Sequence, residues 1–345
     1  MNQQTIDRLL QWYAREKRDL PWRRSKNPYH IWLSEIMLQQ TRVEAVKPYY
    51  HKFLEELPTI EDLANVDEDV LMKLWEGLGY YSRVRNLQSA AKQIVADYGG
   101  SLPADYKELL KLKGIGTYTA GAIASIAFGL PQVAVDGNVL RVCARFYGDE
   151  RDIALSQTKK EVELEWISVL PKEAASAFNQ AIMEIGAMVC IPNGAPKCEV
   201  CPLSPECVAR IQNKQYLYPV KSPKPERRLE ELSVFFMVYN GKIAVHKRTE
   251  KGLLSGLWQL PNCNKEVSTI AQLQEWGIME AEITNLKGYH HLFTHIKWQM
   301  DVYFVEVKEL VENEFTWLTK EGMEQEFALP SAFKKAWIAG CNRIK

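Results

Sequence analysis

The sequence predicts a two-domain protein, with an all-α N-terminal domain and a smaller C-terminal domain of mixed α and β type. At 345 residues the chain is long enough for two hydrophobic cores. Helical patterns extend to residue 212, whereas strand patterns and turns dominate from residue 229. Between them, residues 213–228 form a basic, proline-containing linker. We therefore expect domains at 1–212 and 229–345.

Composition limits the classes of protein to consider. Hydrophobic residues make up 46% and charged residues 25% of the chain, which is ordinary for a globular protein. No apolar run is long enough to span a membrane, and the N-terminal residues lack a signal-peptide pattern, so we expect a cytoplasmic protein. Because 43 basic residues balance 43 acidic ones, nucleic-acid binding would need a local basic face.

The N-terminal region contains two loops rich in aromatic and basic residues. Residues 5–17 predict an amphipathic helix, and the loop LPWRRSKNPYH follows it. Residues 59–98 predict two or three helices with GLGYYSRVRN between them. Such loops either contact a phosphate backbone and stack on bases, or pack and face solvent as ordinary surface loops.

Residues 29–46 carry a carboxylate inside an apolar stripe. On a helix, Ile31, Glu35 and Leu38 share one face. Burial would raise the pKa of Glu35, as a general acid requires. The alternative is a core glutamate neutralised by an arginine or a backbone group. The polar run Gln39–Arg42 could project hydrogen-bonding side chains into a duplex.

Residues 112–138 place a glycine turn between two helical patterns. Gly114 and Gly116 allow a tight turn and a close approach, and the N–H groups of the next helix could hold a phosphate. Asp136 precedes Gly-Asn at the entrance of another helix, where it is either a helix cap or a catalytic carboxylate. No strand precedes the glycines, which argues against a dinucleotide-binding fingerprint.

Four of the seven cysteines fall within eighteen residues, at Cys190, Cys198, Cys201 and Cys207. In a reducing compartment this clustering indicates a metal site and not disulfides. Zinc sites usually pair two short C-x-x-C elements. Here there is one such element and the other spacings are unequal, so a cubane iron–sulfur cluster suits the run better.

The C-terminal region alternates strands and helices. LSVFFMVYNGKIAVHKR predicts two strands around an Asn-Gly hairpin, and IAQLQEWG predicts a helix. A loop and a long strand follow in HHLFTHIKWQMDVYFVEV, and PSAFKKAWIAG closes the chain with a helix. This order favours a mixed α/β domain.

Several motifs in one order support a family resemblance: SEIMLQQTRV, GLGYYSRVRN, LKGIGTYTAGAI, AVDGNVLRV, the four-cysteine run and HHLFTH. Over nearly its whole length the chain resembles the MutY adenine DNA glycosylases of the helix-hairpin-helix superfamily. The resemblance implies an all-α helix-hairpin-helix glycosylase domain with a 4Fe–4S cluster loop at 190–207. It also implies a smaller Nudix-like domain that reads 8-oxoguanine.

The implied reaction is hydrolysis of adenine mispaired with 8-oxoguanine or guanine. Glu35 would protonate adenine N7 as general acid, and Asp136 would stabilise the oxocarbenium-like sugar. Tyr118 and Asn138 would position these groups. The adenine must leave the base stack for this chemistry, and Gln40 and Tyr80 are the candidate wedge residues.

The resemblance also implies binding residues, which fall into four groups by ligand. The implied partner is double-stranded DNA that contains an A:8-oxoguanine or A:G mispair, bound by a monomer. The implied residues are Trp22, Arg23 and Gln180 for adenine; Gln40, Thr41, Tyr80, Arg83, Gly114, Gly116 and Thr117 for DNA; Tyr80, Phe293, Thr294 and His295 for 8-oxoguanine; and Cys190, Cys198, Cys201 and Cys207 for the 4Fe–4S cluster.

The chain departs from the family pattern in two places. Thr294 stands where the family's Phe-Ser-His loop has serine, so the hydroxyl is kept and a methyl is added. The first gap between cysteines has seven residues instead of six. In addition, residues 252–277 lack the paired glutamates of Nudix hydrolases, so no pyrophosphohydrolase activity is expected.

Two rival functions remain open from the sequence. An endonuclease III-like glycosylase with lyase activity needs a lysine amine, but Tyr118 occupies that position of the hairpin. A non-enzymatic DNA-binding protein with a redox-sensing cluster would keep its function after Glu35→Gln.

Overall fold

We analysed a computed structural model of the chain, which describes residues 1–223, 225–249, 252–309 and 313–344. The chain divides into two compact units, one of residues 1–65 and 85–223 and one of residues 66–84 and 224–345. Lys224 of the predicted linker and residues 250, 251, 310–312 and 345 of the predicted second domain lie outside the described residues. Within the described part, no helix has the length and apolar character needed to cross a bilayer.

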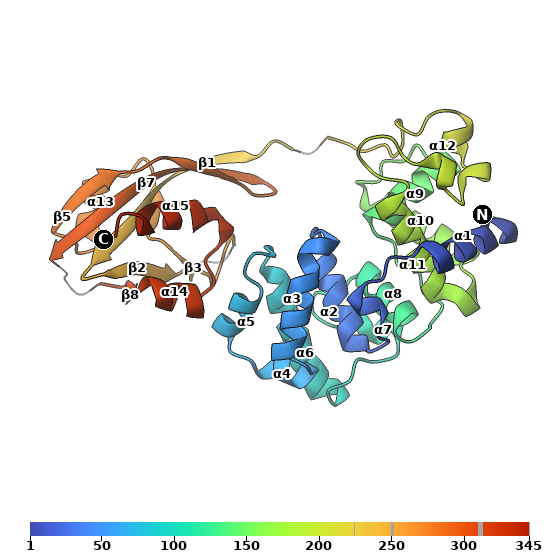
Figure 1. Cartoon of the computed structure of the whole chain (residues 1–345), viewed down its shortest axis with the longest axis horizontal. Helices are drawn as coiled ribbons and strands as arrows, with labels where there is room; N and C mark the ends of the chain where they lie inside the picture. Colours follow the sequence, from blue (N-terminus) through green and yellow to red (C-terminus); the bar gives the residue numbers. More distant parts are fainter. Residues whose placement is uncertain (224, 250–251, 310–312, 345) are drawn as a thin grey trace. The chain divides into compact units, whose positions relative to one another are not determined.

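The first unit is helical, as predicted (Figure 1). Residues 82–84 at the start of α6 belong to the second unit, and the helix belongs to the first unit from Arg85 onward. Its elements are α1 (Gln3–Glu16), η1 (Pro21–Arg23), α2 (Pro28–Leu38), α3 (Val43–Glu56), α4 (Ile60–Asn65), α6 (Ser82–Tyr98), α7 (Tyr106–Leu109), α8 (Thr117–Ile126), α9 (Gly137–Tyr147), α10 (Ser156–Val169), η2 (Lys172–Ala174), α11 (Ala175–Met188), η3 (Cys198–Val200), η4 (Ser204–Glu206) and α12 (Val208–Ile211).

Residues 29–46 contain the end of one helix and the start of another. α2 ends at Leu38, and α3 begins at Val43. Gln40 has a φ of 58°, a left-handed conformation that no helix continues through. The break turns the polar run between the two helices toward the cavity described below.

The second unit is built on a mixed sheet, which confirms the predicted α and β class. Its described strands run in the order β3-β2-β1-β7-β5, with β4 on β1, β6 on β7 and β8 on β2. β1 and β7 are parallel, and their register pairs Val234 with Val302. The elements are α5 (Glu68–Leu74), β1 (Arg228–Tyr239), β2 (Lys242–Lys247), β3 (Trp258–Gln259), β4 (Asn262–Asn264), α13 (Thr269–Glu275), β5 (Glu280–Asn285), β6 (Tyr289–Leu292), β7 (Ile296–Glu309), β8 (Thr316–Leu318), α14 (Lys320–Glu326) and α15 (Ser331–Cys341).

Helices cover both faces of this sheet (Figure 1). Phe236 packs with Phe333 and Trp337 of α15 on one face, whereas Phe235 packs with Leu273 of α13 on the other. Neighbouring side chains of a strand point to opposite faces, so this alternation follows from the sequence FFM. The predicted hairpin is present, with both Asn240 and Gly241 at positive φ.

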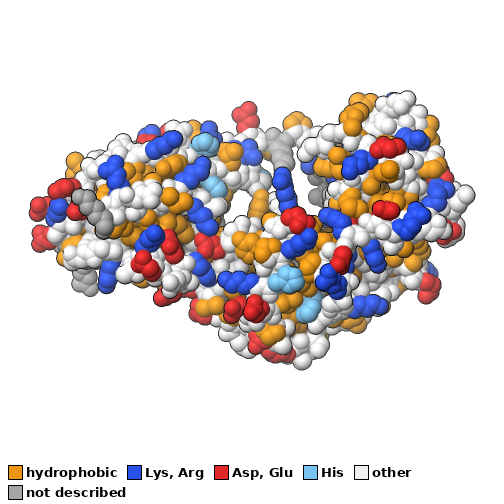
Figure 2. All heavy atoms as spheres, viewed as in Figure 1, with side chains coloured by type: hydrophobic (Ala, Val, Ile, Leu, Met, Phe, Trp, Pro, Cys, Tyr) orange, Lys and Arg blue, Asp and Glu red, His pale blue; other side chains and the backbone are white. Residues whose placement is uncertain are grey.

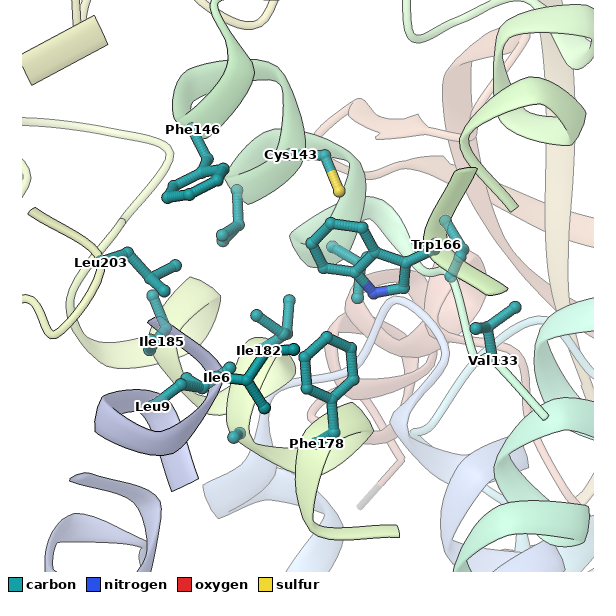
Figure 3. Close-up of a cluster of buried hydrophobic side chains, with 14 of the residues drawn as sticks. Ile6, Leu9, Val133, Cys143, Phe146, Trp166, Phe178, Ile182, Ile185 and Leu203 are labelled. Atoms are coloured by element: carbon teal, nitrogen blue, oxygen red, sulfur yellow. The ribbon is translucent and has the colours of Figure 1, made fainter. Parts of the chain in front are cut away.

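The core of the first unit joins α1, α9, α10 and α11 (Figure 3). Phe178 of α11 is fully buried against Trp166 of α10, with ring centroids 5.6 Å apart. On the outer surface drawn in Figure 2, basic, acidic and hydrophobic side chains are interspersed, in keeping with a net charge of zero. The core therefore fixes α11, which carries Gln180, and α9, which begins directly after Asp136.

Truncation of this core is expected to destabilise the first unit. Phe178→Ala should lower the free energy of unfolding by about 3–5 kcal/mol, because it removes a buried ring and leaves a cavity. Urea denaturation followed by tryptophan fluorescence measures this change. Leu164→Ala is the control, because Leu164 is 70% exposed and should change the free energy by less than about 0.5 kcal/mol. Equal effects of the two substitutions would contradict the assignment of the core.

Candidate active site

A single cavity of about 1270 Å³ in the first unit collects most of the predicted site residues. It is larger than ordinary small-molecule pockets of roughly 300–1,000 Å³, so it has room for more than one free base. The predicted residues that line it are Trp22, Arg23, Glu35, Gln40, Thr41, Gly114, Gly116, Thr117, Tyr118, Asp136, Asn138 and Gln180.

Glu35 reaches the cavity from α2 and is only 7% exposed. The Tyr118 hydroxyl of α8 donates a hydrogen bond to its carboxylate. Burial raises the pKa of Glu35 to about 7, although this hydrogen bond and the charge of Arg23 oppose the shift. A carboxyl with such a pKa is half protonated near neutral pH, which suits a general acid.

The pKa of Glu35 predicts a pH dependence of stability that does not involve activity. A carboxyl with a raised folded-state pKa leaves stability intact below pH 4.5 and reduces it as pH rises toward 7. Glu35→Gln should therefore gain on the order of 3 kcal/mol relative to wild type between pH 4.5 and pH 8. Urea denaturation of both proteins across this range measures the difference, and parallel stability curves would contradict it.

Asp136 lines the same cavity, at the N-cap of α9. Its carboxylate accepts hydrogen bonds from the backbone N–H of Val139 at 2.8 Å and from Asn138 Nδ2 at 2.7 Å. Burial raises the pKa of Asp136, whereas these hydrogen bonds and the charge of Arg141 act to lower it. The donors at a helix N-terminus favour the ionised form.

Buried polar contacts fix the segment that carries Asp136. Asn179 of α11 is 1% exposed; it accepts a hydrogen bond from the N–H of Ala134 and donates to the carbonyl of Gln132 and to Ser125 Oγ. The segment is therefore held between α8 and α11 just before α9 begins.

Close approach of α11 and α9 fixes Asn138. A Cβ at Gly186 would lie 2.5 Å from Asn138 Cβ, so only glycine fits there. Arg141 Nη2 then donates both to Asn138 Oδ1, at 2.9 Å, and to the Gly186 carbonyl, at 2.8 Å. Arg141 Nε donates to the Cys190 carbonyl, so this side chain joins Asn138 to the start of the cysteine loop.

The predicted glycine hairpin joins α7 to α8 at the rim of the cavity. Gly114 has a φ of +77°, and a Cβ there would lie 2.7 Å from Asn86 Cβ. Gly116 is the N-cap of α8, and no side chain caps the first N–H groups of that helix. Thr117 donates its hydroxyl hydrogen to Glu163 of α10.

The two predicted wedge residues share an unusual backbone conformation. Gln40 and Tyr80 have φ of 58° and 47°, which non-glycine residues adopt only at a cost of about 1–3 kcal/mol. Such strain gathers at functional sites. Tyr80 lies in the second unit, where its hydroxyl is 3.0 Å from Thr294 Oγ1. The Arg83 guanidinium packs on the Tyr80 ring and donates to the carbonyls of the preceding turn.

The remaining predicted residues of the second unit are not part of the cavity lining in the described chain: Tyr80, Arg83, Phe293, Thr294 and His295. Phe293 and Thr294 follow β6, and His295 precedes β7. Phe293 packs its ring against Trp298 at 4.9 Å.

The four predicted cysteine ligands surround one small cavity of about 30 Å³. Cys190 Sγ accepts a hydrogen bond from Arg145 Nη1 at 3.3 Å. Across the described residues, no group of three or more His, Cys, Asp or Glu side chains converges as ligands of a metal ion. The donor set around the cavity consists of thiols, the ligands that hold iron–sulfur clusters.

Sequence reasoning missed several charged residues of the cavity wall, among them Arg18 and Glu184. Glu184 follows Gln180 by one helical turn, on the same face of α11. A charged residue at that spacing from a predicted binding residue was the available signal.

Comparisons with known proteins agree with this architecture. The model of the HhH-GPD superfamily base excision DNA repair proteins matches residues 33–171, and the NUDIX domain model matches residues 233–339. An adenine DNA glycosylase of Buchnera aphidicola (subsp. Baizongia pistaciae) is 35% identical over 295 residues, which cover 84% of this chain and 82% of the relative. The chain belongs to the adenine DNA glycosylase family.

Other relatives extend the match within this family and the wider superfamily. The human adenine DNA glycosylase is 32% identical over 397 residues, which cover 95% of this chain and 72% of the relative. Among solved structures, a thermostable thymine-DNA glycosylase matches at 30% identity with a TM-score of 0.55, over 60% of this chain and 95% of that one. Endonuclease III in a non-covalent DNA complex matches at 26% identity with a TM-score of 0.52, over 60% of this chain and 94% of that one.

Family membership confirms the predicted family, the enzyme class and the two-part fold of a helical domain and a Nudix-like domain. The predicted domain boundaries and the individual site residues stay predictions.

Proposed function

We propose that this protein excises adenine mispaired with 8-oxoguanine or guanine in double-stranded DNA, as a monofunctional glycosylase. The observation that carries the proposal is the shared cavity, into which α2 brings Glu35 and the N-cap of α9 brings Asp136. The relatives named adenine DNA glycosylase support the base, and the DNA complex of endonuclease III supports the duplex partner.

The two carboxyl groups suit different roles in the reaction. Glu35, with a pKa of about 7, can donate a proton to adenine N7 and turn the base into a better leaving group. Asp136, held by amide donors, can stabilise the positive charge that develops on the sugar before water attacks. Tyr118 orients the first carboxyl and Asn138 the second.

The other predicted residues would hold the substrate. Trp22, Arg23 and Gln180 line the cavity wall for the extruded adenine. The hairpin amides after Gly116 would bind a phosphate, and Gln40 and Tyr80 would fill the space left in the stack. In the second unit, Tyr80, Phe293, Thr294 and His295 would contact the opposing 8-oxoguanine.

Cys190, Cys198, Cys201 and Cys207 would hold a 4Fe–4S cluster, which when bound would brace the loop 190–207. Two residues of the predicted linker contact the rest of the first unit: the carbonyl of Val220 accepts a hydrogen bond from the N–H of Ile153, and Lys221 lines the main cavity. A monomer that acts on chromosomal DNA would work in the cytoplasm, on the nucleoid.

A duplex cleavage assay tests the function. Adenine is placed opposite 8-oxoguanine, guanine, cytosine or thymine, and strand breaks are measured with and without alkali. We expect adenine release opposite 8-oxoguanine and guanine, with strand breaks only after alkali. No release from any duplex would refute the function, and strand breaks without alkali would indicate a lyase, which the absence of an amine on Tyr118 disfavours.

A further inference from the structure

Glu184 is a buried carboxylate to which the proposed function gives no role. It lies on α11 with an exposed fraction of 0%. Oε1 accepts hydrogen bonds from the backbone N–H of Arg18 at 2.9 Å and from Arg18 Nε at 2.7 Å. Oε2 accepts from Arg18 Nη2 at 2.9 Å and from Arg23 Nη2 at 2.6 Å. Burial opposes the charge, but the hydrogen bonds from both arginines lower the pKa of Glu184 to about 2, so it stays ionised.

This carboxylate belongs to the wall of the catalytic cavity. Glu184 and the two arginines line the same cavity as Glu35 and Gln180. The ion pairs join Arg18, which follows α1, and Arg23 of η1 to α11 within that wall. A substitution at Glu184 therefore changes a charge in the cavity itself.

Arg23 is immobilised from several sides. Besides its bond to Glu184, Arg23 Nη1 donates to the Arg18 carbonyl at 3.0 Å, and its guanidinium lies 5.8 Å from the centroid of the Tyr13 ring. A fixed guanidinium can donate hydrogen bonds to a base with little loss of side-chain entropy. The same positive charge, however, favours the ionised form of Glu35 and would deprive it of its proton.

We propose that Glu184 is a positioning residue, which holds the Arg23 guanidinium against the cavity wall and offsets its positive charge there. Arg23 can then contact adenine while Glu35 keeps its proton. This inference rests on the proposed function, because it assigns Arg23 to the adenine.

The charged and titratable groups around Glu35 are few enough to isolate this effect. Tyr118 from α8, Asp136 from the N-cap of α9 and Arg23 from η1 act on Glu35. Tyr13, Arg18 and Glu184 surround Arg23. The other charged side chains in the lining are Arg42, Arg141, Lys159 and Lys221. A substitution at Glu184 leaves the identity of all the other charged and titratable groups unchanged.

Glu184→Gln removes the charge and keeps the shape of the side chain. We expect the pH at which single-turnover adenine release falls to half to drop by about one unit, because Arg23 is no longer neutralised. With a wild-type midpoint near 7, the rate should then fall about ninefold at pH 8 but only about twofold at pH 6. Glu184→Asp keeps the charge and should keep the wild-type midpoint. Glu165→Gln is the matched control: it removes a carboxylate from Arg151, is half-exposed and should change neither quantity.

Infrared difference spectra, with Glu35→Gln as the blank, measure the pH at which the Glu35 carboxyl is half protonated. This midpoint is obtained without any turnover of substrate. If the Glu35 midpoint drops in Glu184→Gln but wild type releases no adenine, the proposed function fails and Glu184 still acts on Glu35. If wild type releases adenine and the midpoint of Glu184→Gln stays in place, Glu184 is only structural and the inference is overturned.

Should Glu184→Gln not fold, Arg23→Met is the second test. In that variant Glu184 keeps its pair with Arg18, and the Glu35 midpoint should rise. An unchanged midpoint in Arg23→Met would refute the inference.

Discussion

Glu35→Gln is expected to bind a duplex with adenine opposite 8-oxoguanine as wild type does, but to release adenine about 10²–10⁴ times more slowly. Glutamine has nearly the same shape, and its amide oxygen can still accept the hydrogen bond of the Tyr118 hydroxyl. What it lacks is an acidic proton for the leaving base. Single-turnover rates and equilibrium binding on the same duplex separate the two effects.

Glu44→Gln is the matched control for this substitution. Glu44 lies on α3 with a side chain that is 79% exposed, and it pairs with Lys47, three residues away. We expect it to keep both binding and the rate of adenine release. If Glu35→Gln retained a rate within threefold of this control, Glu35 would not be the general acid, and a DNA-binding protein without catalysis would become the better interpretation.

Local motifs predicted the cavity residues well, for a physical reason. Glu35 shares an apolar face with its neighbours, and Asp136 stands at a helix entrance, so a few residues on either side determine both environments. The hairpin glycines likewise have local causes, in a positive φ and a close contact at Gly114. Features that depend on residues close in sequence are those that a single sequence reveals.

Glu184 could not be assigned in this way. Its partners Arg18 and Arg23 lie more than 150 residues earlier, and only the packing of α1 against α11 brings them together. The same holds for Arg141 of α9, whose bonds to the Gly186 carbonyl of α11 and to the Cys190 carbonyl cross between elements. Long-range ion pairs leave no pattern along the chain, because any arginine could serve any buried carboxylate.

The turn between α2 and α3 shows a different limit. The polar run Gln39–Arg42 separates two apolar stretches in the sequence, but the pattern does not fix the backbone conformation there. The chain adopts a left-handed conformation at Gln40, and Gln40 and Thr41 are part of the cavity lining. Backbone strain at a single non-glycine residue leaves no signal in the hydrophobic pattern.

Asp136→Asn should separate the catalytic role of this residue from its role as a helix cap. Asparagine caps helices about as well as aspartate, so α9 should keep its N-cap and the free energy of unfolding should not fall by more than about 0.5 kcal/mol. The neutral amide cannot stabilise a positive sugar. The rate of adenine release should therefore fall by about 10²–10³, the usual loss when one electrostatic group is removed from a transition state.

Asp105→Asn is the control, because Asp105 caps α7 through the N–H groups of Lys107 and Glu108 and is not part of the cavity lining in the described chain. Both variants make the same chemical change at a helix N-terminus, so urea denaturation should give similar changes in the free energy of unfolding. Only Asp136→Asn should lose adenine release in single-turnover assays. If the two variants kept equal rates, Asp136 would act only as a helix cap. The positive charge of the sugar would then need a counter-ion other than Asp136.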